Sequence, residues 1–262
     1  MMLRRWSVFL LILLPACGAG PKPATVTPTP VSRVSENATP GQIDSLWNRG
    51  MKAVRRGKWG DAQKHLERVM LEFPPGDPRI PQAHFFLGEA QLSLGSHLQA
   101  AREFRKVSDE TPNDSLAPAA LLRVGDVYSE LWRRPELDPS YGQTALATYQ
   151  ELLNRYPGGS QAKRAENRIA DLQERFAYKE LKAAMYYFRL KAYDSAILYL
   201  KDLVATYPRA AVAPQALIKL VQAYSKLGYR EDVQETCGYI RRFHPKAHGV
   251  REVCPPDTAG AS

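Results

Sequence analysis

Apolar residues recur at helical spacing along residues 42–246, and this whole region is predicted to be helical. The predicted helix pairs run over residues 43–73, 81–111, 118–156 and 214–243, and a further pair begins with a long helix from Gln161 into Tyr187. In that long helix Ile169, Leu172, Phe176 and Ala183 are spaced so that they share one face. The pattern therefore predicts an all-α fold built from helix pairs.

Within these pairs a small residue, an alanine or valine, and a proline recur at intervals of twelve residues. The four sets are Gly50, Ala62 and Pro74; Gly88, Ala100 and Pro112; Ala184, Ala196 and Pro208; Val221, Val233 and Pro245. A fifth set, Gly125, Ala145 and Pro157, has eight extra residues in its first interval, 20 minus 12. The small residues allow two helix axes to cross closely, and each proline ends the second helix of a pair. Bulky residues that would plug the crossings follow four positions after the alanine or valine, at Leu66, Phe104, Tyr149, Leu200 and, undersized, Cys237.

This register resembles that of the tetratricopeptide repeat, and the resemblance covers residues 42–246. It implies a superhelical solenoid of five helix pairs, a fold that holds other polypeptides on its curved surface. The extra residues of the third repeat, Ser129 to Thr144, are expected to form an ordered excursion or an exposed loop. The expected function is therefore binding, without catalysis.

The first residues of the chain have the features of an export signal. Arg4 and Arg5 precede an apolar run, Ser7 to Leu14, that is too short to span a bilayer. The following Pro15-Ala16-Cys17 resembles the end of a bacterial lipoprotein signal, with Gly at position 18. The resemblance implies removal of residues 1–16, acylation of Cys17 and sorting to the outer membrane. The alternative is an ordinary signal peptide cleaved near Ala16.

Residues 17–41 are rich in Pro, Thr, Ser and Ala and carry almost no large apolar side chain. Such a segment cannot bury enough surface to offset the entropy of ordering, so we predict a disordered linker between the lipidated cysteine and the repeats. A C-terminal tail is predicted over residues 247–262, with Pro255 to Ser262 disordered. The mature protein is thus expected to be tethered to the membrane only by its lipid.

The chain has a formal net charge of +9, and removal of residues 1–16 leaves +7, 34 minus 27. No nucleic-acid-binding module is present, and an exported lipoprotein does not meet nucleic acid, so we expect none as a partner. The positive charge is then explained by acidic protein partners, by anionic lipid headgroups, or by plain solvation of a basic surface.

Two cysteines remain besides Cys17. An oxidising periplasm permits Cys237 and Cys254 to pair, whereas a free Cys237 at its buried plug position would act as a small apolar residue.

In tetratricopeptide folds the first helix of each repeat lines the concave groove. The register places there Trp47, Met51, Arg55, Phe85, Glu89 and Leu92. Aromatic and aliphatic side chains with scattered charges suit an extended or amphipathic peptide with aromatic anchors. Trp47 could instead belong to a capping repeat and pack against the linker. The lysine and asparagine of the carboxylate-clamp variant are replaced by Trp47 and Met51, which argues against capture of an acidic chaperone tail.

The second half of the chain resembles a narrower family within the tetratricopeptide-repeat proteins. The stretch from Phe176 to Pro208 resembles the signature of the BamD family of outer-membrane protein assembly lipoproteins, matching at Glu180, Ala183, Tyr186, Tyr187, Ala192, Tyr193, Ala196, Tyr207 and Pro208. Asp138-Pro139, Arg155-Tyr156-Pro157 and Leu227-Gly228 agree with it. The resemblance implies a periplasm-facing subunit of the β-barrel assembly (BAM) complex, anchored in the outer membrane by lipid.

By the same resemblance, the N-terminal repeats would bind C-terminal segments of unfolded outer-membrane proteins. The C-terminal repeats would dock the POTRA-containing, BamA-like β-barrel insertase, alongside other assembly subunits. Family members often use an arginine on the second helix of the fourth repeat for this docking. Tyr199 is the equivalent residue here, so Lys201 or Lys191 would have to take its part.

A tetratricopeptide envelope lipoprotein could also be a secretin pilotin or an adaptor that coordinates the cell wall with the envelope. Catalysis is disfavoured, because His244 and His248 have no glutamate between them as a zinc protease would. The chain also has no nucleophile elbow, phosphate loop or dinucleotide fingerprint, so we expect no enzyme activity, cofactor or metal.

Overall fold

The computed structural model describes residues 38–254. The predicted signal peptide, the proposed acylation site Cys17, most of the linker and the predicted disorder of Pro255 to Ser262 lie outside the described residues. Within residues 38–254 there are helices and no strand.

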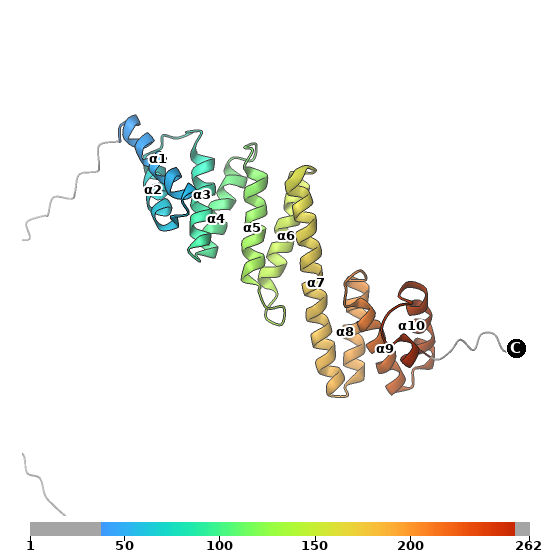
Figure 1. Ribbon diagram of the computed structural model, residues 1–262. Coiled ribbons are helices and arrows are strands. Elements are labelled where there is room, and N and C mark those ends of the chain that lie inside the picture. The colour runs from blue at the N-terminus through green and yellow to red at the C-terminus, as the bar shows by residue number, and fades with distance from the viewer. Residues whose placement is uncertain (1–37, 255–262) are drawn as a thin grey trace, which may run out of the picture. The chain divides into compact units, whose positions relative to one another are not determined.

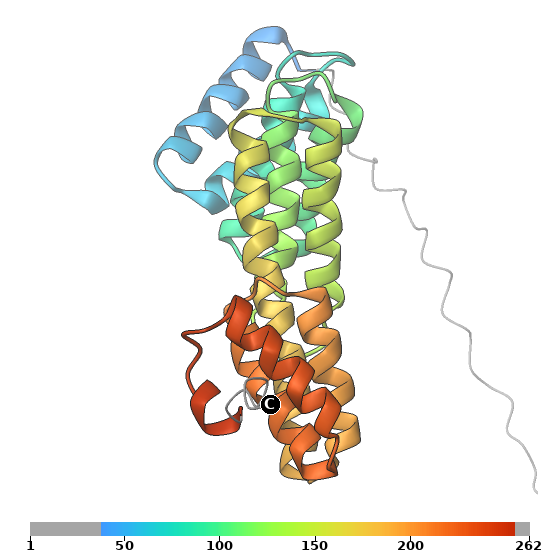
Figure 2. The same cartoon turned by 90° about the vertical axis from the view of Figure 1, so that its right-hand side faces the viewer.

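Ten helices form five consecutive pairs that stack in chain order (Figures 1 and 2). The pairs are α1 (Pro40–Arg55) with α2 (Trp59–Glu72), α3 (Ile80–Ser93) with α4 (His97–Glu110), α5 (Ala117–Leu131) with α6 (Ser140–Arg155), α7 (Gly159–Arg189) with α8 (Tyr193–Thr206), and α9 (Ala213–Leu227) with α10 (Arg230–Phe243). A short helix, α11 (Val250–Val253), follows. The predicted all-α solenoid of five helix pairs is confirmed, including the long helix that opens the fourth pair.

The first helix begins where its local chemistry favours a start. Thr39 accepts a hydrogen bond from the backbone N–H of Gln42, and the Gln42 side chain accepts one from the N–H of Thr39. This reciprocal capping box satisfies two donors that a helix N-terminus leaves unpaired, and Pro40 suits the first helical position because its missing N–H is not needed there. The helical domain therefore starts at Pro40, two residues before the predicted boundary.

The small residues of the register lie where two helices of a pair approach closely. A Cβ atom added at Gly125 would lie 2.4 Å from Cε1 of Tyr149, and one added at Gly88 would lie 2.8 Å from the Phe104 ring. Phe104 and Tyr149 are fully buried plug residues. The crossing has room for the plug only because the facing residue has no side chain, as the register predicts.

The extra residues of the third repeat form an ordered excursion. Residues 132–139 make a loop, and the remainder of the predicted insertion is taken up by the ends of α5 and α6. Trp132 is buried, with its ring 4.5 Å from that of Phe176 on α7 and under the guanidinium of Arg175 at 4.6 Å. The ammonium of Lys179 donates to the carbonyl oxygen of Leu137 at 3.2 Å. The insertion thus packs against the long helix.

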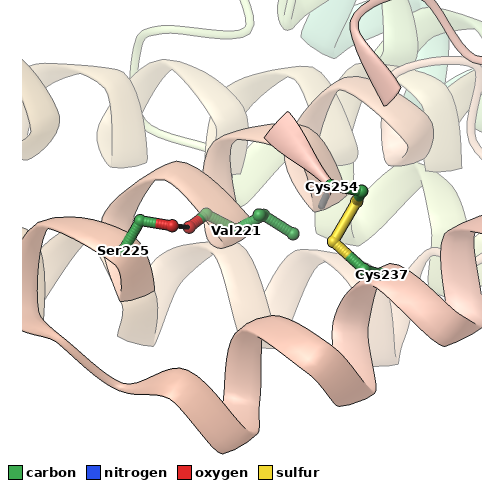
Figure 3. The surroundings of a disulfide bond; sticks show 4 residues. All are labelled: Val221, Ser225, Cys237 and Cys254. Atoms are coloured by element: carbon green, nitrogen blue, oxygen red, sulfur yellow. Dashed lines mark hydrogen bonds between the residues drawn. A yellow bond between two sulfur atoms is a disulfide. The ribbon is translucent and has the colours of Figure 1, made fainter. Parts of the chain in front are cut away.

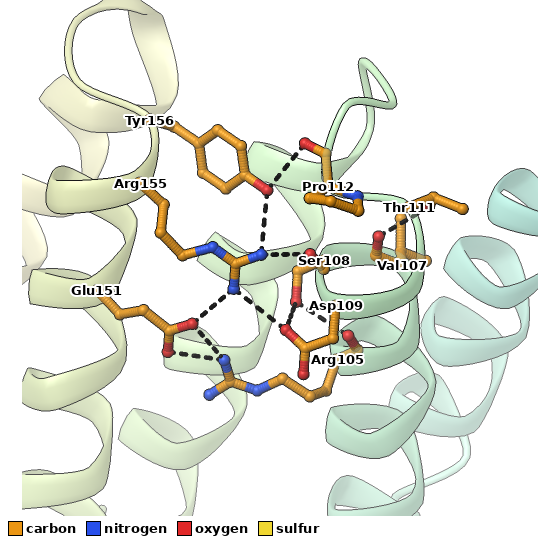
Figure 4. Close-up of polar contacts among 9 residues, drawn as sticks. All are labelled: Arg105, Val107, Ser108, Asp109, Thr111, Pro112, Glu151, Arg155 and Tyr156. Atoms are coloured by element: carbon orange, nitrogen blue, oxygen red, sulfur yellow. Dashed lines mark hydrogen bonds and ion pairs between the residues drawn. The ribbon is translucent and has the colours of Figure 1, made fainter.

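A polar cluster ties the second helices of repeats two and three together (Figure 4). Glu151 on α6 accepts from Arg105 on α4 and from Arg155, each at 2.7 Å. Arg155 also pairs with Asp109 at 3.1 Å and donates to the carbonyl of Ser108. Burial opposes the charge of Glu151, but its hydrogen bonds to the two arginines outweigh that effect and lower its pKa. This network fixes the relative position of neighbouring repeats.

The folded domain continues past the predicted boundary at residue 246. Cys237 on α10 forms a disulfide with Cys254, which follows α11 (Figure 3). Val250 of α11 is buried in the same cluster as Val221 and Ile240. Of the two alternatives that the sequence leaves open for Cys237, the structure has the disulfide. Residues 247–254, assigned to a tail from the sequence, are therefore part of the last repeat's packing.

Reduction of this disulfide is expected to loosen the C-terminal end of the domain. The two cysteines are 17 residues apart, and closing a loop of that length contributes about 3 kcal/mol in the chain-entropy description. In Cys254→Ser we expect faster hydrogen exchange along α10, measured by mass spectrometry, with exchange in α3 unchanged as the internal control. Identical exchange in α10 of the variant and the parent chain would contradict a stabilising role.

Candidate docking surfaces

The six predicted N-terminal groove residues are mostly half-buried. Phe85 and Leu92 on α3 are half-buried and pack against the cluster around Phe104, with the Phe85 and Phe104 rings 5.4 Å apart. Trp47 on α1 is half-buried with its ring 6.0 Å from that of Phe73 at the end of α2. Met51 is half-buried, and Arg55 is exposed. Each of these apolar side chains thus gives part of its surface to packing inside the domain.

Glu89, the sixth of these residues, is bound by a neighbouring repeat. Its two carboxylate oxygens accept from Arg123 on α5 at 2.6 and 2.7 Å. Burial disfavours the charge of Arg123, but its bonds to Glu89 outweigh this and raise the pKa of Arg123 above its ordinary value. A bidentate pair of this kind has its donors and acceptors already matched. Glu89 therefore serves the stacking of repeats two and three.

The same network continues to the long helix. The carboxylate of Asp126, buried on α5, accepts from the hydroxyl of Tyr149 at 2.8 Å and from Nε of Arg168 on α7 at 3.0 Å. Burial and the nearby Asp126 charge raise the pKa of Tyr149, so the phenol stays protonated and donates. The first helices of repeats two, three and four are thereby joined by polar contacts, one of which uses Glu89, a residue that the sequence assigned to a groove.

An open groove lies between α8, α9 and α10, and we term it the C-terminal groove. It has a volume of about 360 Å³ and is lined by Lys201, Val204 and Ala205 from α8, Leu217, Leu220 and Tyr224 from α9, and Asp232, Glu235, Thr236 and Tyr239 from α10. Counted from the first lining residue of each helix, the others lie three, four or seven positions later, so each helix presents a single face. The floor is apolar and the walls are charged.

The charges of the C-terminal groove are arranged on opposite walls. Asp232 and Glu235 lie on α10, whereas Lys201 lies on α8. Tyr224 between them is buried, and burial together with the Asp232 charge raises its pKa. Tyr239 at the rim is 43% exposed. An apolar floor with an exposed tyrosine and polar rims is the usual composition of a protein-binding site.

Of the three predicted docking residues, one lines the C-terminal groove and two do not. Lys201 lines the C-terminal groove, but Tyr199 and Lys191 are not among its lining residues. Tyr199 is stacked on Tyr187 of α7, with ring centroids 5.2 Å apart. Lys191 is exposed in the turn between α7 and α8 with a positive φ of 60°. Glu235 and Tyr239, which sequence reasoning missed, carry a signal in their i, i+4 spacing on a polar helix.

Within residues 38–254, no helix contains an apolar stretch long enough to cross a bilayer. This region also holds no group of three or more His, Cys, Asp or Glu side chains placed to bind a metal ion.

Five stacked helix pairs with small residues at their crossings make this chain a tetratricopeptide-repeat protein. The model of the YfiO family of outer membrane lipoproteins matches residues 40–238. The chain therefore belongs to this family, and the resemblance to the BamD family found in the sequence is confirmed.

Individual relatives agree with this assignment. The chain is 33% identical over 202 residues to the outer membrane protein assembly factor BamD of Vibrio cholerae, covering 73% of this chain and 83% of that protein. It is 27% identical over 207 residues to BamD of Xylella fastidiosa strain 9a5c, covering 74% and 70%. Among solved structures, the TPR2AB domain of yeast Sti1 matches 78% of each chain, with 14% identity and a TM-score of 0.46.

Proposed function

We propose that this chain is a lipid-anchored, periplasm-facing subunit of the machinery that inserts β-barrel proteins into the outer membrane. The observation that carries the proposal is a match to a family of outer membrane lipoproteins that runs from α1 into α10. Relatives that cover most of the chain are named as outer membrane protein assembly factors. The role is binding, and the proposal includes no catalytic step.

The C-terminal groove is the proposed docking site for the barrel insertase, a protein with periplasmic POTRA domains. A partner that inserts an apolar ridge over Val204 and Ala205, which keep part of their surface exposed, would remove these surfaces and its own from water. A basic side chain of the partner would face Glu235 on α10, and an acidic one would face Lys201 on α8. In this proposal Lys201, one of the two lysines that the sequence offers, takes the part of the family's docking arginine.

The N-terminal repeats are the proposed binding region for C-terminal segments of unfolded barrel proteins. Trp47, Met51 and Phe85 keep part of their surface exposed, and Arg55 is fully available at the end of α1. An extended peptide with aromatic side chains could bind along these residues. Because Glu89 is already paired with Arg123, the contacts would be mainly apolar and weak, near micromolar or above, which permits release to the insertase.

The lipid anchor makes a separate prediction. If Cys17 is acylated, Cys17→Ser should move the protein from the outer-membrane fraction to the soluble periplasm, because no second acyl attachment would hold it. The measurement is fractionation followed by immunoblotting, with Cys254→Ser as the control cysteine variant that stays on the membrane. An unchanged membrane fraction for Cys17→Ser would contradict acylation at this position.

The proposed function is tested by depleting the chain in its own organism. Folded outer-membrane β-barrels, recognised by their heat-modifiable migration on gels, should fall while outer-membrane lipoproteins stay near normal levels. Re-expression of the parent chain should restore them. Normal barrel levels after depletion would count against an assembly role.

A further inference from the structure

The C-terminal end of the domain carries a concentration of positive charge that the docking groove does not use. Between residues 241 and 254 there are four basic residues and one carboxylate, Glu252. The basic residues are Arg241, Arg242, Lys246 and Arg251. We call these four, with Phe243, the basic C-terminal patch. Arg242, Phe243, Lys246 and Arg251 are all exposed.

Part of this patch surrounds a cavity. Arg241 at the end of α10 and Arg251 of α11 line the same space of about 380 Å³, together with Pro245, Val250 and Cys254. The two arginines come from separate segments that the disulfide of Cys254 joins covalently. Their positions relative to each other are therefore fixed by the fold (Figure 2 shows α10 and the segment after it). The exposed guanidinium of Arg251 at this cavity favours an anionic group such as a phosphate.

An exposed aromatic residue adjoins the charges. Phe243 is 56% exposed, and its ring lies 4.7 Å from that of Tyr239. The guanidinium of Arg242 lies 5.2 Å from the centre of the Phe243 ring. Aromatic side chains next to basic ones are the composition of protein surfaces that contact the interface of a membrane.

A purely structural explanation covers only half of the charge. Arg241 and Arg242 occupy the last turn of α10, where a cation is favoured by the partial negative charge of the helix C-terminus. Lys246 lies beyond the end of α10, and Arg251 belongs to a helix of four residues. Within residues 38–254, neither the helix dipole nor an ion pair accounts for the charges of Lys246 and Arg251.

We propose that the basic C-terminal patch binds the headgroups of anionic phospholipids. Charge complementarity identifies an anionic partner, and the exposed Phe243 favours a membrane over a fully hydrated anion. The family is one of outer membrane lipoproteins, so a membrane surface lies within the environment of such a chain. This contact would orient the array against the bilayer at the end opposite to the helix pair that follows the linker in sequence. It goes beyond the docking of partner proteins and stands whether or not an insertase occupies the C-terminal groove.

The test uses the full chain carrying Cys17→Ser, so that no acyl chain contributes. Its co-sedimentation is measured with vesicles of phosphatidylcholine alone and of phosphatidylcholine mixed with phosphatidylglycerol. We expect binding only to the mixed vesicles, weakened by added salt. Arg242→Glu with Lys246→Glu should weaken this binding about thirtyfold or more, from the usual contribution of each basic residue at an anionic surface.

A matched control is Lys163→Glu with Arg164→Glu, which makes the same change in charge at two exposed residues of α7. It should leave vesicle binding within about twofold, since the charges lie outside the patch. Phe243→Ser, a change at an exposed position, should also weaken binding while thermal melting by circular dichroism stays that of the parent. Equal losses in patch and control variants, or no preference for phosphatidylglycerol, would overturn the proposal. Binding to polyglutamate without binding to vesicles would identify an acidic protein as the partner instead and would overturn it too.

Discussion

Gly125→Ala is expected to destabilise the domain by about 3 kcal/mol and to lower its melting temperature by roughly 6 to 12 °C. The added Cβ would lie 2.4 Å from Tyr149 Cε1, which is too short for a contact between non-bonded carbon atoms. Tyr149 cannot move aside easily, because it is fully buried and its hydroxyl is bound to Asp126. The single methyl group therefore forces apart α5 and α6 or breaks the Tyr149 hydrogen bond. Thermal and urea unfolding followed by circular dichroism measure the change.

Gly238→Ala is the matched control for this experiment. Gly238 is also within a helix, α10, but it is exposed and an added Cβ would have no neighbour within 4 Å. The same substitution should stabilise the domain there by up to about 1 kcal/mol, because alanine favours helix more than glycine does. The change in the free energy of unfolding is therefore expected to have opposite signs at Gly125 and Gly238. If Gly125→Ala were as well tolerated as Gly238→Ala, close crossing of helices would not be the reason for the small residues.

Glu235→Lys combined with Tyr239→Ala is expected to weaken binding of the insertase's purified periplasmic domain about hundredfold. Both side chains line the C-terminal groove and both are exposed, so the changes remove a charge and an aromatic contact without entering the core. A tyrosine at the rim of an apolar floor is typical of the few residues that dominate an interface. Calorimetry or surface plasmon resonance with the purified domain gives the affinity.

The control for the groove variant makes the same two substitutions elsewhere. Glu166→Lys with Tyr178→Ala changes two exposed residues of α7 that do not line the groove. Its affinity should stay within a few-fold of the parent, and its melting temperature should match that of the groove variant. Equal affinity of the groove variant and this control would place the docking site on another surface.

Much of the fold was predictable because the repeat register reports local packing. Ala62, Ala100, Ala145 and Ala196 were predicted at helix crossings from their spacing to a glycine or alanine and a proline, and all four are fully buried. Such a register needs no knowledge of distant contacts, since the two helices of a pair are adjacent in sequence. It ends at Pro245, and a four-residue helix has no periodicity of its own. For this reason α11 and its burial of Val250 could not be predicted.

The candidate sites were harder to predict because they depend on contacts between repeats. Glu89 and Arg123 are 34 residues apart and meet across neighbouring repeats, which turns a predicted groove residue into a structural one. Opposite charges one repeat apart are a sequence signal that could have indicated this pair. The C-terminal groove depends on how α10 lies relative to α8, and no spacing within either helix reports that arrangement. The spacing of Glu235 and Tyr239 marks one face of α10, and only the structure shows that this face lines a groove with α8 and α9.

Assignment to the barrel assembly machinery is tested most directly by purifying the full chain from its own cells in mild detergent and identifying the proteins bound to it by mass spectrometry. We predict recovery of a β-barrel protein with POTRA domains, and loss of that protein from the Glu235→Lys, Tyr239→Ala variant. Recovery of a secretin or a cell-wall synthase, with no POTRA-containing barrel, would contradict the assignment and favour a pilotin or an envelope adaptor.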